Sequence, residues 1–176
     1  MRNTNQRRSL LVIAGALAAV TVLVSTSVVS ATGANVARAN GDLIAYVNPY
    51  GDGTPNPVAG GQASVHAVAT ASGKTIVTLH VSGLPANRSF GSHVHILACD
   101  DNKAGGHYRN VPSDPASPDN EIWLDFTTNA AGAGEAHATV DWVIRDGGAK
   151  AVVIHNATTN SGGVAGPKLG CLNVDF

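Results

Sequence analysis

The sequence predicts an all-β protein, an antiparallel sandwich or barrel of eight short strands. Three observations favour this fold class. Short segments with alternating apolar and polar residues recur from residue 43 onward. Stretches rich in glycine, proline and asparagine separate these segments. No segment of this part of the chain has a convincing helical pattern.

The first half of this domain is expected to contain a β-hairpin and a strand that carries two histidines. Residues 48–61 are rich in glycine, proline and asparagine and are expected to form a loop. The hairpin turns at Ser72-Gly73, which lies between two alternating segments. The expected strands of this half are residues 43–47, 62–71, 74–82 and 90–97.

The second half is expected to begin with a long irregular loop, residues 99–121, which contains three prolines. Loops longer than about 15 residues in compact domains are usually functional. A second hairpin turns at residues 130–132. The remaining expected strands are residues 122–128, 134–143, 151–155 and 169–174. No repeat or linker is visible, so the strands are expected to form one domain.

Four histidines lie in settings that favour metal binding. His93 and His95 are two residues apart on an expected strand, so their side chains share one face. His107 follows Gly105-Gly106, and His155 ends an apolar run. Four imidazoles suit copper or zinc better than calcium or magnesium, which prefer oxygen ligands.

In this order, and with Lys168-Leu169-Gly170-Cys171 near the C-terminus, these residues resemble the copper/zinc superoxide dismutase family. The resemblance extends from about residue 82 to Cys171. It implies an eight-stranded antiparallel Greek-key barrel and a disulfide between Cys99 and Cys171. It also implies a copper site, whose ligands would be His93, His95, His107 and His155.

The zinc site of the family is incomplete in this sequence. The family residue that matches His107 bridges copper and zinc, and two zinc histidines follow it in the same loop. Here no histidine lies between His107 and His137, and Ile122 stands where a zinc histidine is expected. Asp125 matches the zinc aspartate, but zinc normally takes three or four protein ligands. We therefore expect a copper-only variant, with Asp125 as a vestigial zinc position.

Two carboxylates lie close enough in sequence to approach His107. Glu121 or Asp125 could accept a hydrogen bond from the free imidazole nitrogen and fix the tautomer. The alternative is that both are solvated charges at the start of a strand. The sequence leaves these two alternatives open.

The resemblance implies an exported copper-dependent superoxide dismutase, which converts superoxide to oxygen and hydrogen peroxide. His107 and Lys168 would be the catalytic residues. His107 would leave copper in the reduced state and carry a proton, a role that suits an imidazole. Lys168 occupies the position of the family's active-site arginine and keeps the positive charge, but lacks the planar fork of donors. The alternatives are a non-catalytic copper storage or transfer protein, and a barrel that only binds a partner.

The other charged and aromatic residues have simpler interpretations. Residues 156–167 carry no charge, so attraction of superoxide would depend on the copper, Lys168 and Arg109. A plain surface position is the favoured interpretation of Arg109. The tryptophans are expected to pack in the protein, and the remaining histidines to face solvent. An accessory metal between His66 and His80 is the less favoured alternative. These residues are Trp123, Trp142, His66, His80 and His137.

The N-terminal 39 residues have the layout of a secretory signal peptide. Three arginines precede an apolar stretch over residues 10–24, and Ala37-Arg38-Ala39 follows. The expected mature domain is residues 40–176, with a cut after Ala31 as one alternative and a retained membrane anchor as another. We expect an exported protein, extracellular or in the cell envelope, with no stable membrane span once the leader is removed.

Charge and cysteine content limit the expected partners and the expected compartment. Removal of residues 1–39 takes away four arginines and no acidic residue, so the formal net charge changes from −1 to −5. An acidic chain without a basic cluster is not expected to bind nucleic acid. The two cysteines suit an oxidising compartment. The expected small-molecule partner is the superoxide anion, and the working hypothesis for the oligomeric state is a monomer.

Overall fold

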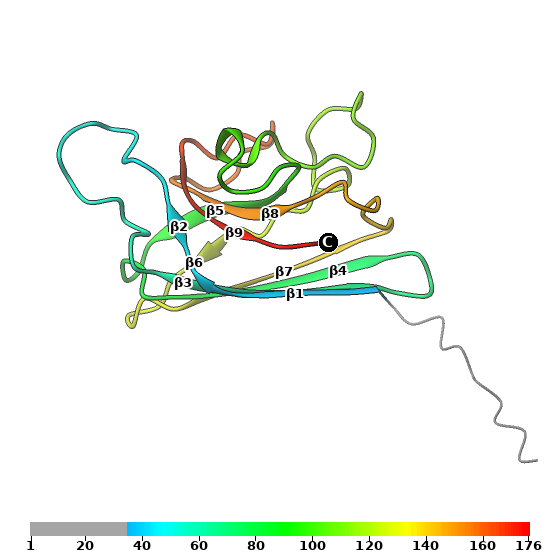
Figure 1. Cartoon of the computed structure of the whole chain (residues 1–176), viewed down its shortest axis with the longest axis horizontal. Coiled ribbons are helices and arrows are strands. Elements are labelled where there is room, and N and C mark those ends of the chain that lie inside the picture. The colour runs from blue at the N-terminus through cyan, green and yellow to red at the C-terminus, as the bar shows by residue number, and fades with distance from the viewer. Residues whose placement is uncertain (1–34) are drawn as a thin grey trace, which may run out of the picture. The chain divides into compact units, whose positions relative to one another are not determined.

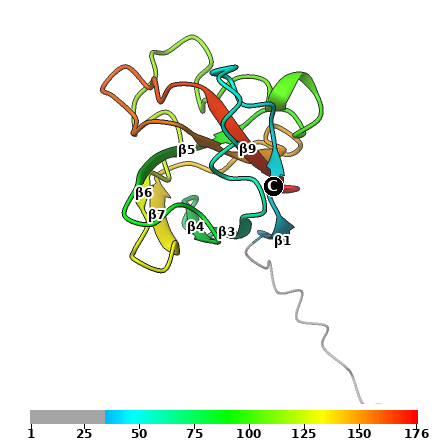
Figure 2. The ribbon, with the colours of Figure 1, turned by 90° about the vertical axis from the view of Figure 1, so that its left-hand side faces the viewer.

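Two antiparallel β-sheets face each other in the part of the chain that the computed structural model describes, residues 35–176 (Figures 1 and 2). Sheet A has the order β1 (Asn35–Asp42), β3 (Gln62–Ala69), β4 (Thr75–Ser82), β7 (Gly134–Val140). Sheet B has the order β2 (Ile44–Ala45), β9 (Lys168–Asn173), β8 (Ala151–His155), β5 (Ser89–His95), β6 (Phe126–Thr127). Residues 1–34, which include most of the expected leader, lie outside the described residues.

The predicted all-β antiparallel class is confirmed, but the finer architecture differs from the prediction. The strands of residues 35–176 form two separate sheets and are not hydrogen-bonded into one closed barrel. Among these residues the one short helix-like segment is η1 (Asn102–Ala104), a single turn whose three residues all have positive φ. No helix within residues 35–176 has the length and apolar character needed to cross a membrane.

Strand β1 was not predicted from the sequence. It pairs with β3 through all eight of its residues, from Asn35 opposite Ala69 to Asp42 opposite Gln62. Its small residues also fit the pattern that precedes a signal-peptide cut. Because residues 35–39 were assigned to the leader, this strand was not predicted.

The main core lies between the two sheets, because alternation along each strand buries one face. Burial of each such aliphatic or aromatic side chain stabilises the fold by about 1.5–3 kcal/mol. Core side chains from the paired strands include Val65, Val77, Leu79, Phe90, Val94, Val152 and Ile154. Since Phe90, Val94, Val152 and Ile154 point into this core, the alternate residues of β5 and β8 face away from sheet A. These outward positions include three of the four histidines.

A smaller cluster covers the outer side of sheet B around the Cys99–Cys171 disulfide. The bond joins the loop after β5 to β9 across 72 residues. Ala104, Ala151 and Val153 pack around it and are fully buried. In the chain-entropy model a bridge over so long a loop stabilises the fold by about 4 kcal/mol. The bridge thus holds the long loop against the strands.

We expect the position of a leader cut to matter for stability. A chain that begins at Asn40 lacks five of the eight residues of β1, including Ala37 and Ala39, which pack against the core. A chain that begins at Thr32, after the alternative cut, keeps the whole strand. The loss of cross-strand hydrogen bonds should lower the free energy of unfolding by about 2–4 kcal/mol. Urea unfolding of the two chains measures the difference, and equal stability would show that this half of β1 contributes little.

Candidate metal centre

Four histidine side chains meet on the outer side of sheet B. His93, His95, His107 and His155 each place one nitrogen so that all four nitrogens lie within 4.8 Å of one another. His93, His95 and His155 are buried, whereas the side chain of His107 is 17% exposed. Within residues 35–176 this is the one group of three or more histidine, cysteine or acidic residues arranged to hold a metal.

Strand pairing accounts for the positions of these residues. β5 pairs with β8, with Gly91 opposite His155 and His93 opposite Val153, so the outward histidines of the two strands are neighbours. His107 belongs to the long loop and forms an isolated bridge with His95. Two rigid strands therefore supply three imidazoles, and the loop supplies the fourth.

His95 and His155 direct lone pairs toward each other. His95 Nδ1 lies 3.1 Å from the carbonyl oxygen of Gly105, and His155 Nδ1 lies 3.1 Å from that of Gly166. Because a carbonyl only accepts, each Nδ1 carries the hydrogen in the neutral ring. The two Nε2 atoms, 3.3 Å apart, are then both acceptors. A cation near both nitrogens would satisfy them.

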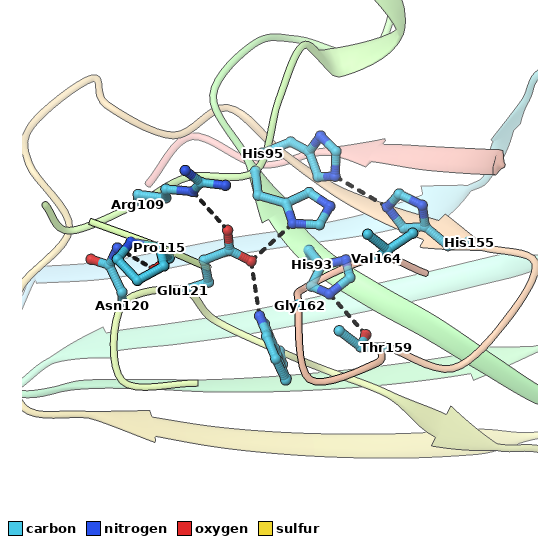
Figure 3. A network of polar contacts seen from close by, with 12 residues as sticks. His93, His95, Arg109, Pro115, Asn120, Glu121, His155, Thr159, Gly162 and Val164 are labelled. Atoms are coloured by element: carbon cyan, nitrogen blue, oxygen red, sulfur yellow. Dashed lines mark hydrogen bonds and ion pairs between the residues drawn. The ribbon is translucent and has the colours of Figure 1, made fainter. Parts of the chain in front are cut away.

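His93 is fixed by a hydroxyl that is itself fixed by a carboxylate. Figure 3 shows the contact between His93 and Thr159. Thr159 Oγ1 lies 2.6 Å from Asp125 Oδ1, to which it donates, and accepts from His93 Nε2 at 2.9 Å. The remaining nitrogen, His93 Nδ1, is buried and has no hydrogen-bond partner. Leaving a buried polar atom unpaired costs about 1–3 kcal/mol. Metal binding would remove this cost.

His107 donates from Nδ1 to Glu121 Oε2 at 2.9 Å. Glu121 is 1% exposed and also accepts from Trp123 Nε1 at 2.9 Å and Arg109 Nε at 3.0 Å. Burial raises the pKa of Glu121, but the hydrogen bonds from His107, Trp123 and Arg109 outweigh it and lower the pKa to about 2. The carboxylate is therefore charged at neutral pH, and Figure 3 shows its contacts.

Burial keeps three of the imidazoles neutral. It lowers the pKa of His93 and of His95 to about 2 and that of His155 to about 4, from an ordinary value of 6.5. Neighbouring imidazoles contribute further to these shifts. A neutral imidazole is the form that binds a metal, so the cluster needs to lose few protons.

The metal-free protein is expected to lose stability in acid. Because the folded pKa values of His93, His95 and His155 lie below 6.5, the unfolded chain binds protons first as pH falls. Each histidine lowers the free energy of unfolding by up to about 1.4 kcal/mol per pH unit below pH 6.5, toward its folded pKa. Urea unfolding of the metal-free protein at pH 7, 6 and 5 measures this slope. A stability that stays constant between pH 7 and 5 would contradict it.

The hydroxyl of Thr159 is expected to raise copper affinity. Thr159→Val removes the acceptor that fixes His93, and loss of such an outer contact typically costs about 10–100-fold in metal affinity. Thr159→Ser keeps the hydroxyl and should retain most of the affinity. Competition with a copper chelator measures both variants. If Thr159→Val binds copper as tightly as the wild type, the contact does not orient His93.

Asp125 and Ile122 are not arranged around His107. Asp125 accepts hydrogen bonds from the Ser92 and Thr159 amides at 3.1 and 2.6 Å, in addition to the Thr159 hydroxyl. The side chain of Ile122 is buried in the main core. Of the two carboxylates considered for His107, Glu121 is the one that contacts it.

Lys168 lies beside His155 at an irregular point in the β8–β9 pairing. Its Nζ donates to the carbonyl oxygen of Lys103 at 2.7 Å and to that of Gly105. Burial lowers the pKa of Lys168, and the nearby charge of Lys103 adds to this. Arg109 contacts Glu121 and so belongs to the surroundings of His107.

Two residues of the centre were missed or misjudged in the sequence. Thr159 lies in an uncharged loop of small residues, where a supporting hydroxyl has no distinctive pattern. Trp123 was expected only to pack, but its indole N–H donates to Glu121. The spacing of Glu121 and Trp123 was the one available signal, because alternate residues of an extended segment share a face. His66, His80 and His137 are exposed on sheet A, as expected.

Comparisons with known proteins support the fold alone. No protein-family model matches the chain, and no curated protein matches it in sequence. The structure is similar to the crystal structure of the clock protein EA4, with a TM-score of 0.56 and 16% sequence identity. The match covers 82% of this chain and 96% of that chain. At 16% sequence identity the similarity is evidence for the arrangement of the strands and is not evidence for any activity.

Proposed function

We propose that this protein is an exported copper-dependent superoxide dismutase with the Greek-key strand arrangement of that family. The observation that carries the proposal is the set of four converging imidazole nitrogens, with the unused nitrogen of each ring held by a hydrogen bond. The sequence resemblance described above supports the choice of reaction. The disulfide is compatible with export.

The donor set favours copper. Imidazole suits copper and zinc, and copper(II) binds a given nitrogen site more tightly than the other divalent first-row metals. No cysteine or carboxylate joins the four nitrogens, so the ligand set itself is neutral. Three ligands come from strands and one from a loop, which permits His107 to move while the others stay.

Copper would supply a one-electron couple, so that one superoxide loses an electron to become oxygen while a second gains one and two protons to become hydrogen peroxide. His93, His95 and His155 would hold the metal throughout. His107 would take a proton on Nε2 and release it, while Glu121 keeps the ring oriented through Nδ1. The partial exposure of His107 gives the proton access to water.

A structural zinc is not part of the proposal. Asp125 already accepts three hydrogen bonds, and Ile122 offers no ligand atom. Protein loaded with both metals is therefore expected to retain copper and lose zinc on dialysis. One equivalent of zinc that survives beside copper would contradict this part of the proposal.

Superoxide turnover tests the proposed activity. Copper-loaded protein, dialysed to remove loose metal, should accelerate superoxide decay in proportion to its copper content in pulse radiolysis. His155→Ala should lose this activity, whereas His137→Ala, exposed on sheet A, should keep it. Stoichiometric copper without turnover would contradict the enzyme assignment.

A copper storage or transfer protein is the second candidate. One observation favours it: two carbonyls occupy the Lys168 ammonium, which leaves it less free to attract an anion. This candidate predicts tight copper binding, no superoxide turnover, and release of copper to an acceptor protein or chelator. The turnover measurement separates the two candidates.

A further inference from the structure

The loop after β5 contains a left-handed turn. Four successive residues have positive φ: Asn102 at 44°, Lys103 at 49°, Ala104 at 65° and Gly105 at 63°. Glycine adopts this conformation freely and asparagine tolerates it, but lysine and alanine do so at a cost in free energy. Contacts elsewhere in the protein must therefore hold Lys103 and Ala104 in place.

One side of the turn is held by packing and by backbone hydrogen bonds. Ala104 is fully buried in the cluster around the disulfide, and its carbonyl accepts from Leu97 N at 3.2 Å. Gly105 N donates to Asn102 O at 3.1 Å, which closes the turn. These contacts do not involve the carbonyl groups of Lys103 and Gly105.

Lys168 provides the contact for those two carbonyl groups. Its Nζ reaches both from β9, more than 60 residues away in sequence. Hydrogen bonds from a charged donor are stronger than neutral ones. The ammonium therefore ties the left-handed turn to sheet B beside His155.

The same turn touches the metal-binding histidines. The carbonyl oxygen of Gly105 accepts from both Lys168 Nζ and His95 Nδ1. Gly106 follows and accepts from Ile96 N at 3.1 Å, and His107 comes next. A displacement of Gly105 would thus rotate the His95 ring and shift the backbone that carries His107.

We propose that Lys168 is a positioning residue of the metal centre, which holds the strained turn Asn102–Gly105 and through it orients His95 and His107. This role differs from the attraction of superoxide. The proposal rests on the proposed metal centre but not on its turnover of superoxide.

Lys168→Met separates the two roles, because it keeps the aliphatic stem and removes the donors. The positioning role predicts that copper affinity falls about 10–100-fold and that the copper(II) electron paramagnetic resonance spectrum changes. Lys168→Arg supplies two donors and should restore both. Unchanged affinity and spectrum in Lys168→Met, with only a slower and less salt-dependent superoxide reaction, would overturn the proposal.

A matched pair at Lys103 tests the role of strain. Lys103→Ala and Lys103→Gly both remove the charge, but only glycine relieves the positive φ. Lys168→Met is then added to each of these two variants. The fold loss of copper affinity that it causes should be at least about threefold smaller in the Lys103→Gly background than in the Lys103→Ala background, because less strain remains to be held. Equal losses in the two backgrounds would contradict a role in holding a strained turn.

Two further measurements keep the test independent of folding and of copper. If Lys168→Met does not fold, Lys168→Gln takes its place in the test. Its side chain retains uncharged N–H donors, so its copper affinity should lie between that of the wild type and that expected for Lys168→Met. The second measurement is hydrogen exchange between the Gly105 amide and solvent in metal-free protein. This exchange should be at least about tenfold faster in whichever Lys168 variant folds than in the wild type. Unchanged exchange overturns the proposal. A wild type that binds no copper would overturn the proposed function and the metal-binding part of this proposal, whereas faster exchange in the variant would still show that Lys168 holds the turn.

Discussion

Alanine at His95 or His155 is expected to lower copper affinity by more than about a hundredfold. Each residue supplies one of four converging nitrogens, and no other histidine, cysteine or acidic residue of the described chain joins that group. The loss should exceed the roughly 10–100-fold effect of removing an outer contact. Competition with a chelator of known affinity measures it.

The control for these variants is another histidine that lies away from the cluster. His137 is exposed on sheet A and contacts Thr78. His137→Ala should bind copper as the wild type does, and all three variants should keep the disulfide. Full copper retention in both His95→Ala and His155→Ala would show that copper binds elsewhere.

Replacement of Glu121 by alanine is expected to lower the stability of the metal-free protein strongly. The buried carboxylate accepts from His107, Arg109 and Trp123, and its removal leaves these donors unpaired. We expect the free energy of unfolding to fall by about 2–4 kcal/mol, less than for a fully buried ion pair because Arg109 reaches solvent. Urea unfolding of the metal-free variant at pH 7 measures the change.

An exposed glutamate provides the comparison for Glu121. Glu135 lies 3.8 Å from His80, and both side chains are more than half exposed. Glu135→Ala should change stability by no more than about 0.5 kcal/mol. If Glu121→Ala is as stable as Glu135→Ala, the network around His107 does not contribute to folding.

Local patterns were enough to predict the strands that carry the histidines. Alternation around His93 and His95 predicts one shared face, and the apolar run before His155 predicts a buried strand. The pairing that makes these strands neighbours is a tertiary property, and the family resemblance anticipated the grouping of the four histidines. The prediction of an antiparallel all-β fold is confirmed, whereas the closed barrel is not what the hydrogen bonding of residues 35–176 shows.

Other features have no local pattern from which they could be predicted. The choice of Glu121 over Asp125 depends on which side of the centre each carboxylate faces, and both fit the spacing. Thr159 acts through a hydroxyl in a loop, and the turn at Asn102–Gly105 has left-handed residues that are not glycine. Tertiary contacts impose these conformations against local preference. They are the places where the sequence is least informative.

We propose above that the four histidines bind one copper ion. The most direct test is copper titration of the oxidised, metal-free protein, followed by electron paramagnetic resonance and metal analysis after dialysis against a weak chelator. We expect one retained copper per chain with nitrogen ligands, and loss of this copper when His93, His95 and His155 are replaced together. A chain that retains no copper, or that retains it with the same spectrum after these replacements, would show that these histidines do not form a copper site.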